Sequence, residues 1–269
     1  MLDTETVTIG DATLYRGDCL TWLSFIEPRS VRLVWTDPPY GNGNADDDFL
    51  SRRQHAMKDG RATASKAIAN DGAADMARVI DGMLDALPPL LTDPSAVCVC
   101  CAGGGPTPVF AWLAERMNTR GLRFFHSVIW DKANPGIGWR YRRQHEMVIV
   151  GNHYGGALSW NEAVPPMPNI LRYPKPREIE HTNEKPLALV ERMLVAHTMP
   201  GDLVLDPFMG SGTTGVAALK HGRRFIGIEL DPEHFNTACQ RIDRARRQPS
   251  LLDPYEQNDA AYTQAEFFD

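Results

Sequence analysis

Two short motifs hold the residues whose types and spacing could do chemistry. The first is Asp37-Pro38-Pro39-Tyr40, which directly follows the compact apolar run 31–36. Consecutive prolines end a strand, because neither can donate a hydrogen bond to the ladder. Taken for structure alone, the motif is therefore a proline turn. Taken for function, it places a carboxylate, a backbone carbonyl and an aromatic ring at one strand end, which suits a planar base with an exocyclic amino group.

The second motif spans residues 206–214 (DPFMGSGTT) and lies between a predicted strand and a predicted helix. Glycines let a ligand approach the backbone, and the amino end of a helix offers unpaired N–H groups to anionic atoms. A further strand ends in Glu229, about 20 residues on, where a carboxylate can hold both hydroxyls of a ribose. Gly-x-Gly alone also fits a tight turn, but with the downstream acid it favours a nucleotide-type cofactor.

The elements that must position these motifs alternate between strand and helix. Such alternation predicts an α/β fold, a doubly wound and mostly parallel sheet covered on both faces. If the two motif strands are neighbours in it, both carboxyl ends open at a topological switch point, where α/β sheets bind ligands. We expect strands at 7–9, 12–15, 31–36, 96–101, 124–130, 146–150, 203–205 and 225–228, and helices at 18–25, 76–91, 107–118, 185–198, 213–221 and 232–246.

The composition bounds the class of protein. Of 269 residues, 43% are hydrophobic and 23% charged, which excludes disorder of the whole chain. No apolar run approaches the roughly 18–20 residues of a membrane helix, and the start, MLDTETVTIG, lacks a signal-peptide core. We therefore expect no membrane partner and a cytoplasmic location. The net charge of −6 gives no global attraction for nucleic acid, so any such binding must come from local basic patches.

The segments divide into one domain and a tail. We expect a single domain over 1–247, with a mobile loop at 41–75 and an irregular, proline-rich element at 151–180. Residues 248–269 are acidic and form the expected C-terminal tail. Cys98, Cys100 and Cys101 cluster, but no second C-x-x-C or paired histidine accompanies them. We interpret them as cysteines of a buried strand and expect no metal.

The two motifs in this order resemble a known family. Further matching positions are 17–20 (GDCL), 129–132 (IWDK), 145–146 (HE) and 181–186 (HTNEKP). Together, from about residue 12 to 246, they resemble the S-adenosylmethionine-dependent DNA amino-methyltransferases of the beta group, in which the catalytic motif precedes the cofactor motif. The resemblance implies a Rossmann-like methyltransferase sheet in permuted motif order, with the 151–180 insertion as a minimal target-recognition element.

The resemblance also implies the cofactor S-adenosyl-L-methionine and the residues that bind it. Glu229 would hold the ribose hydroxyls, and Asp18 with Cys19 would contact the adenine. Thr182, Asn183 and Lys185 would lie near the methionine end, although the family pattern has Pro and then Thr where Thr182 and Asn183 stand. The remaining pocket residues would be Asp206, Phe208, Gly210, Gly212 and Thr213.

For the reaction, the resemblance implies methyl transfer to a base flipped out of the duplex. Asp37 and the Pro38 carbonyl would accept the amino protons, and Tyr40 would stack on the base. Asp-Pro-Pro-Tyr is typical of adenine-N6 enzymes and Ser-Pro-Pro-Tyr of cytosine-N4 enzymes, so adenine is the predicted target and cytosine the alternative. The motifs are also compatible with an RNA or protein methyltransferase, with an NAD-dependent dehydrogenase, which the spacing of 210–215 formally fits, and with a silent DNA-binding module.

The expected partner is double-stranded DNA, contacted by local basic residues. Arg140, Arg142 and Arg143 stand with two aromatic residues between predicted strands, and Arg52 with Arg53 lies in the expected mobile loop. A solvated charged turn is the alternative for the first group. The arginines at 241–247 are interpreted as coating the last helix. No nuclease is evident, which indicates a solitary methylase or half of a restriction-modification pair, and a homodimer is common in the beta group.

Overall fold

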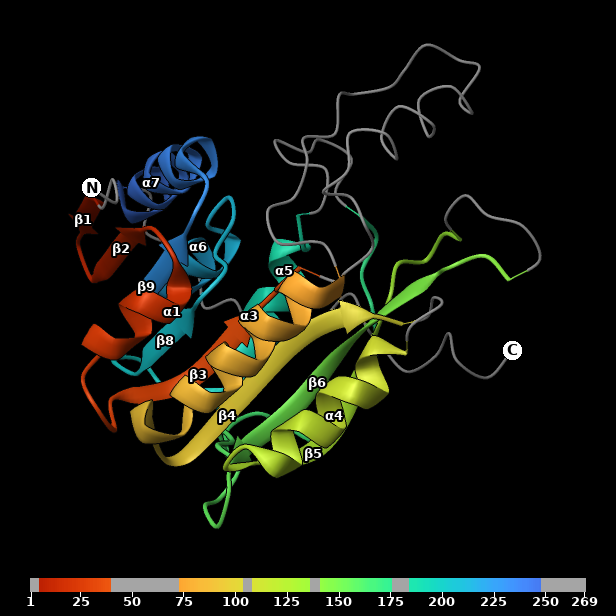
Figure 1. Ribbon diagram of the computed structural model, residues 1–269. Coiled ribbons are helices and arrows are strands. Elements are labelled where there is room, and N and C mark those ends of the chain that lie inside the picture. Colours follow the sequence, from red (N-terminus) through yellow and green to blue (C-terminus); the bar gives the residue numbers. More distant parts are fainter. Residues whose placement is uncertain (1–4, 40–72, 104–107, 136–140, 176–183, 248–269) are drawn as a thin grey trace.

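The computed structural model describes residues 5–39, 73–103, 108–135, 141–175 and 184–247 (Figure 1). Within these ranges the strands form one sheet in the order β1-β2-β9-β8-β3-β4-β6-β5-β7. The strands are β1 (Glu5–Ile9), β2 (Ala12–Arg16), β3 (Val31–Thr36), β4 (Leu91–Ala102), β5 (Leu122–Asp131), β6 (His145–His153), β7 (Ile170–Arg172), β8 (Leu203–Asp206) and β9 (Arg224–Glu229). The helices are α1 (Cys19–Trp22), α3 (Ala73–Ala86), α4 (Val109–Thr119), α5 (Leu187–His197), α6 (Thr213–Lys220) and α7 (Pro232–Arg247), with short 3-10 turns η1 (Leu23–Phe25) and η2 (Pro88–Leu90).

The sheet is mostly parallel, as the alternation of elements predicts. Strands β2, β9, β8, β3 and β4 run side by side in one direction. Strand β6 pairs antiparallel with both β4 and β5, and β1 pairs antiparallel with β2. Each motif strand thus sits inside the sheet, where it is hydrogen-bonded on both sides and its end is held in place.

Helices cover both faces of the sheet, which confirms the doubly wound arrangement. Apolar residues of α5, α6 and α7 pack on one face, and those of α1, α3 and α4 pack on the other (Figure 1). Strand β3 serves both layers, because Leu33 and Trp35 face the first set of helices while Val34 faces the second. A strand buried on both faces has a continuous apolar sequence, which explains VRLVWT.

The clustered cysteines belong to this core. Cys98 and Cys100 of β4 face the α5–α7 layer, whereas Cys101 faces the opposite layer with α3 and α4. All three are buried and free, and burial raises the pKa of the Cys101 thiol to about 12. The interpretation as cysteines of a buried strand is confirmed. In the described ranges no three His, Cys, Asp or Glu side chains gather as metal ligands would.

Several elements differ from the sequence prediction, and three of the differences are large. Helix α3 begins at Ala73, inside the segment expected to be a loop, whose residues 41–72 lie outside the described part. Strand β4 begins at Leu91, five residues before the predicted strand. Strand β7 (Ile170–Arg172) lies within the expected irregular element and pairs in parallel with β5. A three-residue strand carries no periodicity, and its pairing comes from the neighbouring edge of β5 rather than from local propensity.

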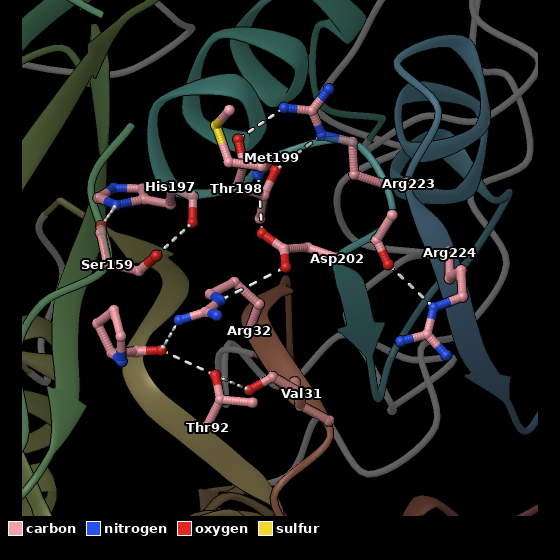
Figure 2. A network of polar contacts seen from close by, with 12 residues as sticks. Val31, Arg32, Thr92, Ser159, His197, Thr198, Met199, Asp202, Arg223 and Arg224 are labelled. Carbon is pink, nitrogen blue, oxygen red and sulfur yellow. Dashed lines mark hydrogen bonds and ion pairs between the residues drawn. The ribbon is translucent and has the colours of Figure 1, made fainter. Parts of the chain in front are cut away.

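The amino ends of the central strands are tied together by polar contacts (Figure 2). Arg32 Nε of β3 lies 3.6 Å from Asp202 Oδ1, just before β8, and Asp202 Oδ2 accepts the Met199 N–H at 2.8 Å. The buried Arg223 guanidinium donates to the Thr198 hydroxyl at 3.0 Å and to the Thr198 carbonyl at 2.6 Å. This edge of the sheet is therefore closed by structural bonds.

Among the helices of the described residues, none has the length and apolar character needed to cross a membrane.

Candidate active site

The carboxyl ends of four neighbouring parallel strands bring the two motifs together. Strand β3 leads into Asp37 and β8 ends at Asp206, and the two strands pair in parallel with Leu33 opposite Val204. Strands β9 and β2 follow next in the sheet, ending at Glu229 and leading into Asp18. The chain leaves β3 toward β4 and leaves β8 toward β9, in opposite directions, so this is a topological switch point. The motif strands are therefore neighbours, which is the condition under which the sequence analysis places both of their carboxyl ends at a switch point.

Asp206 joins the two motifs through its side chain. Its Oδ1 accepts the Thr36 hydroxyl of β3 at 2.8 Å and the Phe208 N–H at 3.1 Å, and its Oδ2 accepts the Thr214 hydroxyl at 2.6 Å. The residue is only 3% exposed. Burial raises the pKa of its carboxyl to about 6 in spite of these three hydrogen bonds. Asp206 therefore holds the start of the glycine turn against the end of β3.

The glycine turn after β8 needs its glycines for two different reasons. Gly210 and Gly212 have φ values of +51° and +84°, a region that side chains with a Cβ rarely adopt. A Cβ on Gly212 would lie 2.9 Å from the Ala238 Cβ of α7. A Cβ on Gly210 would meet no heavy atom of the described residues within 4 Å. Gly212 is thus required for close helix packing, whereas the backbone at Gly210 is open to an approaching ligand.

Glu229 joins the turn to the end of β9. Its Oε2 accepts the Gly210 N–H at 2.9 Å and its Oε1 accepts the Asp231 N–H at 2.7 Å. Burial raises the pKa of this carboxyl to about 7. The Glu229 carbonyl accepts the Gly17 N–H at 2.9 Å, which brings the β2 end alongside. Each carboxylate oxygen keeps lone-pair capacity beyond its backbone partner.

Asp18 and Cys19 follow Gly17 directly and open helix α1. The Asp18 side chain caps this helix by accepting the Leu20 N–H at 2.9 Å. Cys19 is buried, and burial raises the pKa of its thiol to about 12. Both residues therefore lie at the same sheet edge as Glu229, as the sequence predicts for a shared pocket. Phe208, by contrast, packs partly against the α1–α3–α4 layer.

The amino end of α6 is braced by residues that the sequence analysis missed. Thr213 donates its hydroxyl to Glu184 Oε1 at 2.9 Å, and Arg241 of α7 forms an ion pair with the same carboxylate. Arg241 also donates to the Ser211 carbonyl at 2.9 Å. The interpretation that Arg241 only coats the last helix is wrong, because its guanidinium binds Ser211 and Glu184. Arg241 lies beside Ile242 at the edge of the buried stripe of α7. This position in the helical pattern could have indicated that its side chain makes contacts within the protein.

Asp37 lies in a chain of alternating charges. Lys185 Nζ forms an ion pair with Asp37 Oδ2 and lies 3.2 Å from Glu146 Oε2. Lys132 Nζ lies 2.8 Å from Glu146 Oε1. Both ammonium groups stand over the Trp130 ring, 5.9 and 5.5 Å from its centroid. Glu146 and Trp130 were noted in the sequence only as family-like positions without a role.

The opposite charges in this cluster shift one another's pKa values. Burial would lower the pKa of Lys185, but Asp37 and Glu146 outweigh it and hold that pKa above its usual value. Burial would raise the pKa of Glu146, but Lys185 and Lys132 hold it below its usual value. At neutral pH Lys185 and Glu146 are therefore charged. Lys185 was expected near the methionine end of a cofactor, and the structure places its ammonium on Asp37.

The other candidate residues divide between described and undescribed parts. Pro38 is buried and Pro39 half-buried behind Asp37. Arg142 and Arg143 are exposed between β5 and β6, next to Tyr141, which is 97% exposed. Arg142 donates to the Pro135 carbonyl at 3.2 Å. Outside the described residues lie Tyr40, Arg52, Arg53, Arg140, Thr182 and Asn183.

Comparisons of sequence agree with this arrangement. The family model N6_N4_Mtase, described as DNA methylase, matches residues 31–240. DNA adenine methyltransferase YhdJ of Escherichia coli (strain K12) is 40% identical over 260 residues, covering 87% of this chain and 83% of that protein. The Type II methyltransferase M2.MboI of Moraxella bovis is 24% identical over 245 residues, covering 85% and 86%. Both relatives thus align along most of their length.

Solved structures share the fold. M1.HpyAVI in its complex with S-adenosylmethionine (SAM) superposes with a TM-score of 0.61 at 25% identity, over 86% of this chain and 99% of that one. PvuII DNA methyltransferase, which is cytosine-N4-specific, reaches a TM-score of 0.65 at 18% identity, over 96% and 94%, which shows the fold alone. The family match over most of the chain and the 40%-identical relative lead to one conclusion: the chain belongs to the N6/N4 DNA methylases, which use S-adenosylmethionine as cofactor.

Proposed function

We propose that this chain methylates the exocyclic N6 of adenine in double-stranded DNA. The observation that carries the proposal is the parallel pairing of β3 with β8, which sets Asp37 next to the turn that follows Asp206. The choice of adenine is supported by Asp at position 37 and by the relative named DNA adenine methyltransferase. Cytosine N4 is the alternative acceptor within the same family.

The catalytic groups act by accepting hydrogen bonds. Asp37 and the Pro38 carbonyl accept hydrogen bonds from the two N–H groups of the amino group on the target base. These hydrogen bonds favour a pyramidal nitrogen with a localised lone pair. Tyr40 stacks on the flipped base, and such stacking contributes about 1–3 kcal/mol. Because the acceptor strand and the cofactor strand are bonded neighbours, the reacting atoms are aligned before reaction, and such positioning can lower a barrier by about 7–11 kcal/mol.

The residues at the ends of β2, β8 and β9 fit the cofactor. Glu229 offers acceptor oxygens for ribose hydroxyls, and Asp18 with Cys19 stands beside it for the adenine. The open side of Gly210 admits the ligand to the backbone. S-adenosylmethionine supplies a sulfonium methyl group that an amino nitrogen can attack. Thr182, Asn183 and Lys185 are proposed for the methionine end, with Phe208, Gly212 and Thr213 shaping the rest.

DNA is proposed to contact the basic residues beside this edge. Arg142 and Arg143 are exposed in the β5–β6 connection, which carries Lys132 of the Asp37 charge chain at its start. Arg140, Arg52 and Arg53 complete the proposed set. Phosphate contacts position a protein on the duplex without reading its sequence. The duplex must release the target base, at a cost of a few kcal/mol.

The test is transfer of a tritiated methyl group from S-adenosylmethionine to unmethylated genomic DNA, with wild type beside Asp37→Ala. The DNA is digested and its nucleosides are separated. We expect label in N6-methyladenine from wild type and a loss of at least a hundredfold in the variant. Cofactor binding measured by calorimetry should survive in Asp37→Ala, which shows that the variant is folded. Label in N4-methylcytosine would refute the adenine assignment.

A further inference from the structure

The charge chain at Asp37 continues away from the proposed base pocket into the sheet. Lys185 bridges Asp37 of β3 and Glu146 of β6, and Lys132 holds the other oxygen of Glu146. We propose that Glu146 is a positioning residue for methyl transfer, which shares Lys185 with Asp37 and so sets the orientation and acceptor strength of the Asp37 carboxylate. The proposal rests on the proposed role of Asp37 as acceptor.

Glu146 is well placed to act as a fixed anchor. It pairs with Ala102 of β4 on one side and with Trp130 of β5 on the other, inside the antiparallel part of the sheet. Its side chain is largely buried, and Lys132 holds its Oε1 at 2.8 Å. Its Oε2 is thereby fixed as a second anion for Lys185.

Lys185, in contrast, has a long and flexible side chain, so the position of its ammonium depends on the groups around it. It precedes α5, and its side chain is only 8% exposed. Among the groups around its ammonium are Asp37, Glu146 and the face of Trp130. If Glu146 lost its charge, the Lys185 ammonium would interact more strongly with Asp37. The Asp37 carboxylate would then be a weaker acceptor for the hydrogen bonds of the amino group.

The electrostatic balance follows from the groups that face this cluster. Burial raises the pKa values of the nearby β4 thiols, which therefore stay protonated, and burial raises the pKa of Asp206 to about 6. At neutral pH Asp206 is thus mostly ionised and adds a negative charge near Asp37, whereas Lys185, which Glu146 shares, supplies a positive one. In the described part of the chain the titratable and charged groups facing the cluster are Asp37, Cys100, Cys101, Lys132, Glu146, Lys185 and Asp206.

A buried ion pair contributes little net stability, because desolvation of the charges offsets their attraction. The position of Lys185 between two carboxylates at the end of β3 bears instead on the charge around Asp37. The same chain offers a matched comparison in Glu191 of α5, which has a lowered pKa and whose ion pairs are made with Lys220 at 3.1 Å and His221 rather than with Lys185 or Asp37.

The test compares Glu146→Gln, Glu146→Asp and the control Glu191→Gln with wild type in full-length protein. Single-turnover methyl transfer is measured at saturating cofactor and DNA, with the dissociation constants of both. We expect Glu146→Gln to slow transfer at least tenfold at pH 7 with both constants within twofold of wild type. Glu146→Asp should recover part of the rate, and Glu191→Gln should match wild type.

The comparison of rate with binding separates positioning from structural damage. Loss of the Glu146 charge should slow methyl transfer without weakening either ligand, and Glu146→Asp, which keeps a carboxylate, should be faster than Glu146→Gln. A Glu146→Gln rate within twofold of wild type, or a Glu146→Asp rate no higher than that of Glu146→Gln, would overturn the proposal. Label from wild type in N4-methylcytosine would refute only the adenine assignment, because the rate comparison still reports on the same acceptor carboxylate.

Discussion

Asp206 and Glu229, at the carboxyl ends of the adjacent strands β8 and β9, have different roles. Asp206 accepts three protein hydrogen bonds and joins β8 to Thr36 of β3. Glu229 accepts one backbone N–H group on each oxygen and stands where β9 ends. The first carboxylate is therefore part of the scaffold, and the second combines a scaffold contact with capacity for a ligand.

At the residue scale, cofactor affinity should depend on pH through Glu229. Burial raises the pKa of this carboxyl to about 7, so it is protonated below that pH and ionised above it. Ribose hydroxyls donate more strongly to the ionised form, and the cofactor carries net positive charge. Affinity should thus fall as pH drops below 7, by up to about tenfold per pH unit. Calorimetric titration at pH 5.5 to 8.5 measures it.

The control for this dependence is Glu229→Gln, which has no titrating carboxyl. It should bind the cofactor weakly, with the same affinity across the pH range. A wild-type affinity that does not change between pH 5.5 and 8.5 would contradict the assignment of Glu229 to the cofactor.

At the element scale, the turn between β8 and α6 depends on α7 as well as on its own glycines. Gly212 allows α7 to approach at Ala238, and Arg241 of α7 reaches back to the Ser211 carbonyl and to Glu184. Helix α7 therefore fixes the turn from outside the pocket. Its apolar stripe of Phe235, Ala238 and Ile242 holds it on the sheet.

Alanine at the two glycines should separate packing from ligand access. Gly212→Ala combines left-handed strain with overlap on Ala238, at a cost of about 2–4 kcal/mol in the free energy of unfolding. Gly210→Ala carries only the strain, about 1–2 kcal/mol, but places a methyl on the open side of the turn. Urea unfolding and calorimetry should show the larger stability loss in Gly212→Ala and a cofactor affinity loss of about tenfold in Gly210→Ala. Equal effects in both assays would contradict this division.

At the scale of the whole molecule, a net charge of −6 opposes DNA, so binding must be local. The double variant Arg142→Ala/Arg143→Ala should raise the dissociation constant for DNA and leave that for the cofactor unchanged. For every phosphate that the variant no longer neutralises, the slope of log affinity against log salt should become shallower by about 0.9. Fluorescence anisotropy at several salt concentrations measures the slope.

A matched charge change elsewhere provides the control for the DNA prediction. Arg244 and Arg247 are exposed on α7, and Arg247 pairs with Asp243 at 2.6 Å. Replacing both by alanine should leave the salt slope as in wild type. If the two double variants show the same reduction in slope, the β5–β6 connection has no special role in DNA binding.

In the molecule as a whole, the features that could be predicted from the sequence are those that depend on neighbouring residues. The bounds of β3 were predicted correctly because Pro38 and Pro39 end the strand locally. The pairing of β3 with β8 could be stated only as a condition for a shared site, because the sequence does not give the order of strands in a sheet. Strand β7 and the inward contacts of Arg241 could not be predicted, because both depend on a partner distant in the sequence. The charge chain from Asp37 to Lys132 was missed for the same reason.

The hydrogen bond between Thr36 and Asp206 also has a consequence for biosynthesis. Its two residues are 170 positions apart, and at the usual 5–20 residues per second their syntheses are separated by roughly 10–30 s. During that interval one edge of β3 has no partner strand, and an unpaired apolar edge is a template for association between nascent chains. The contact that aligns the two halves of the site therefore also leaves one edge of β3 unpaired while the residues between Thr36 and Asp206 are synthesised.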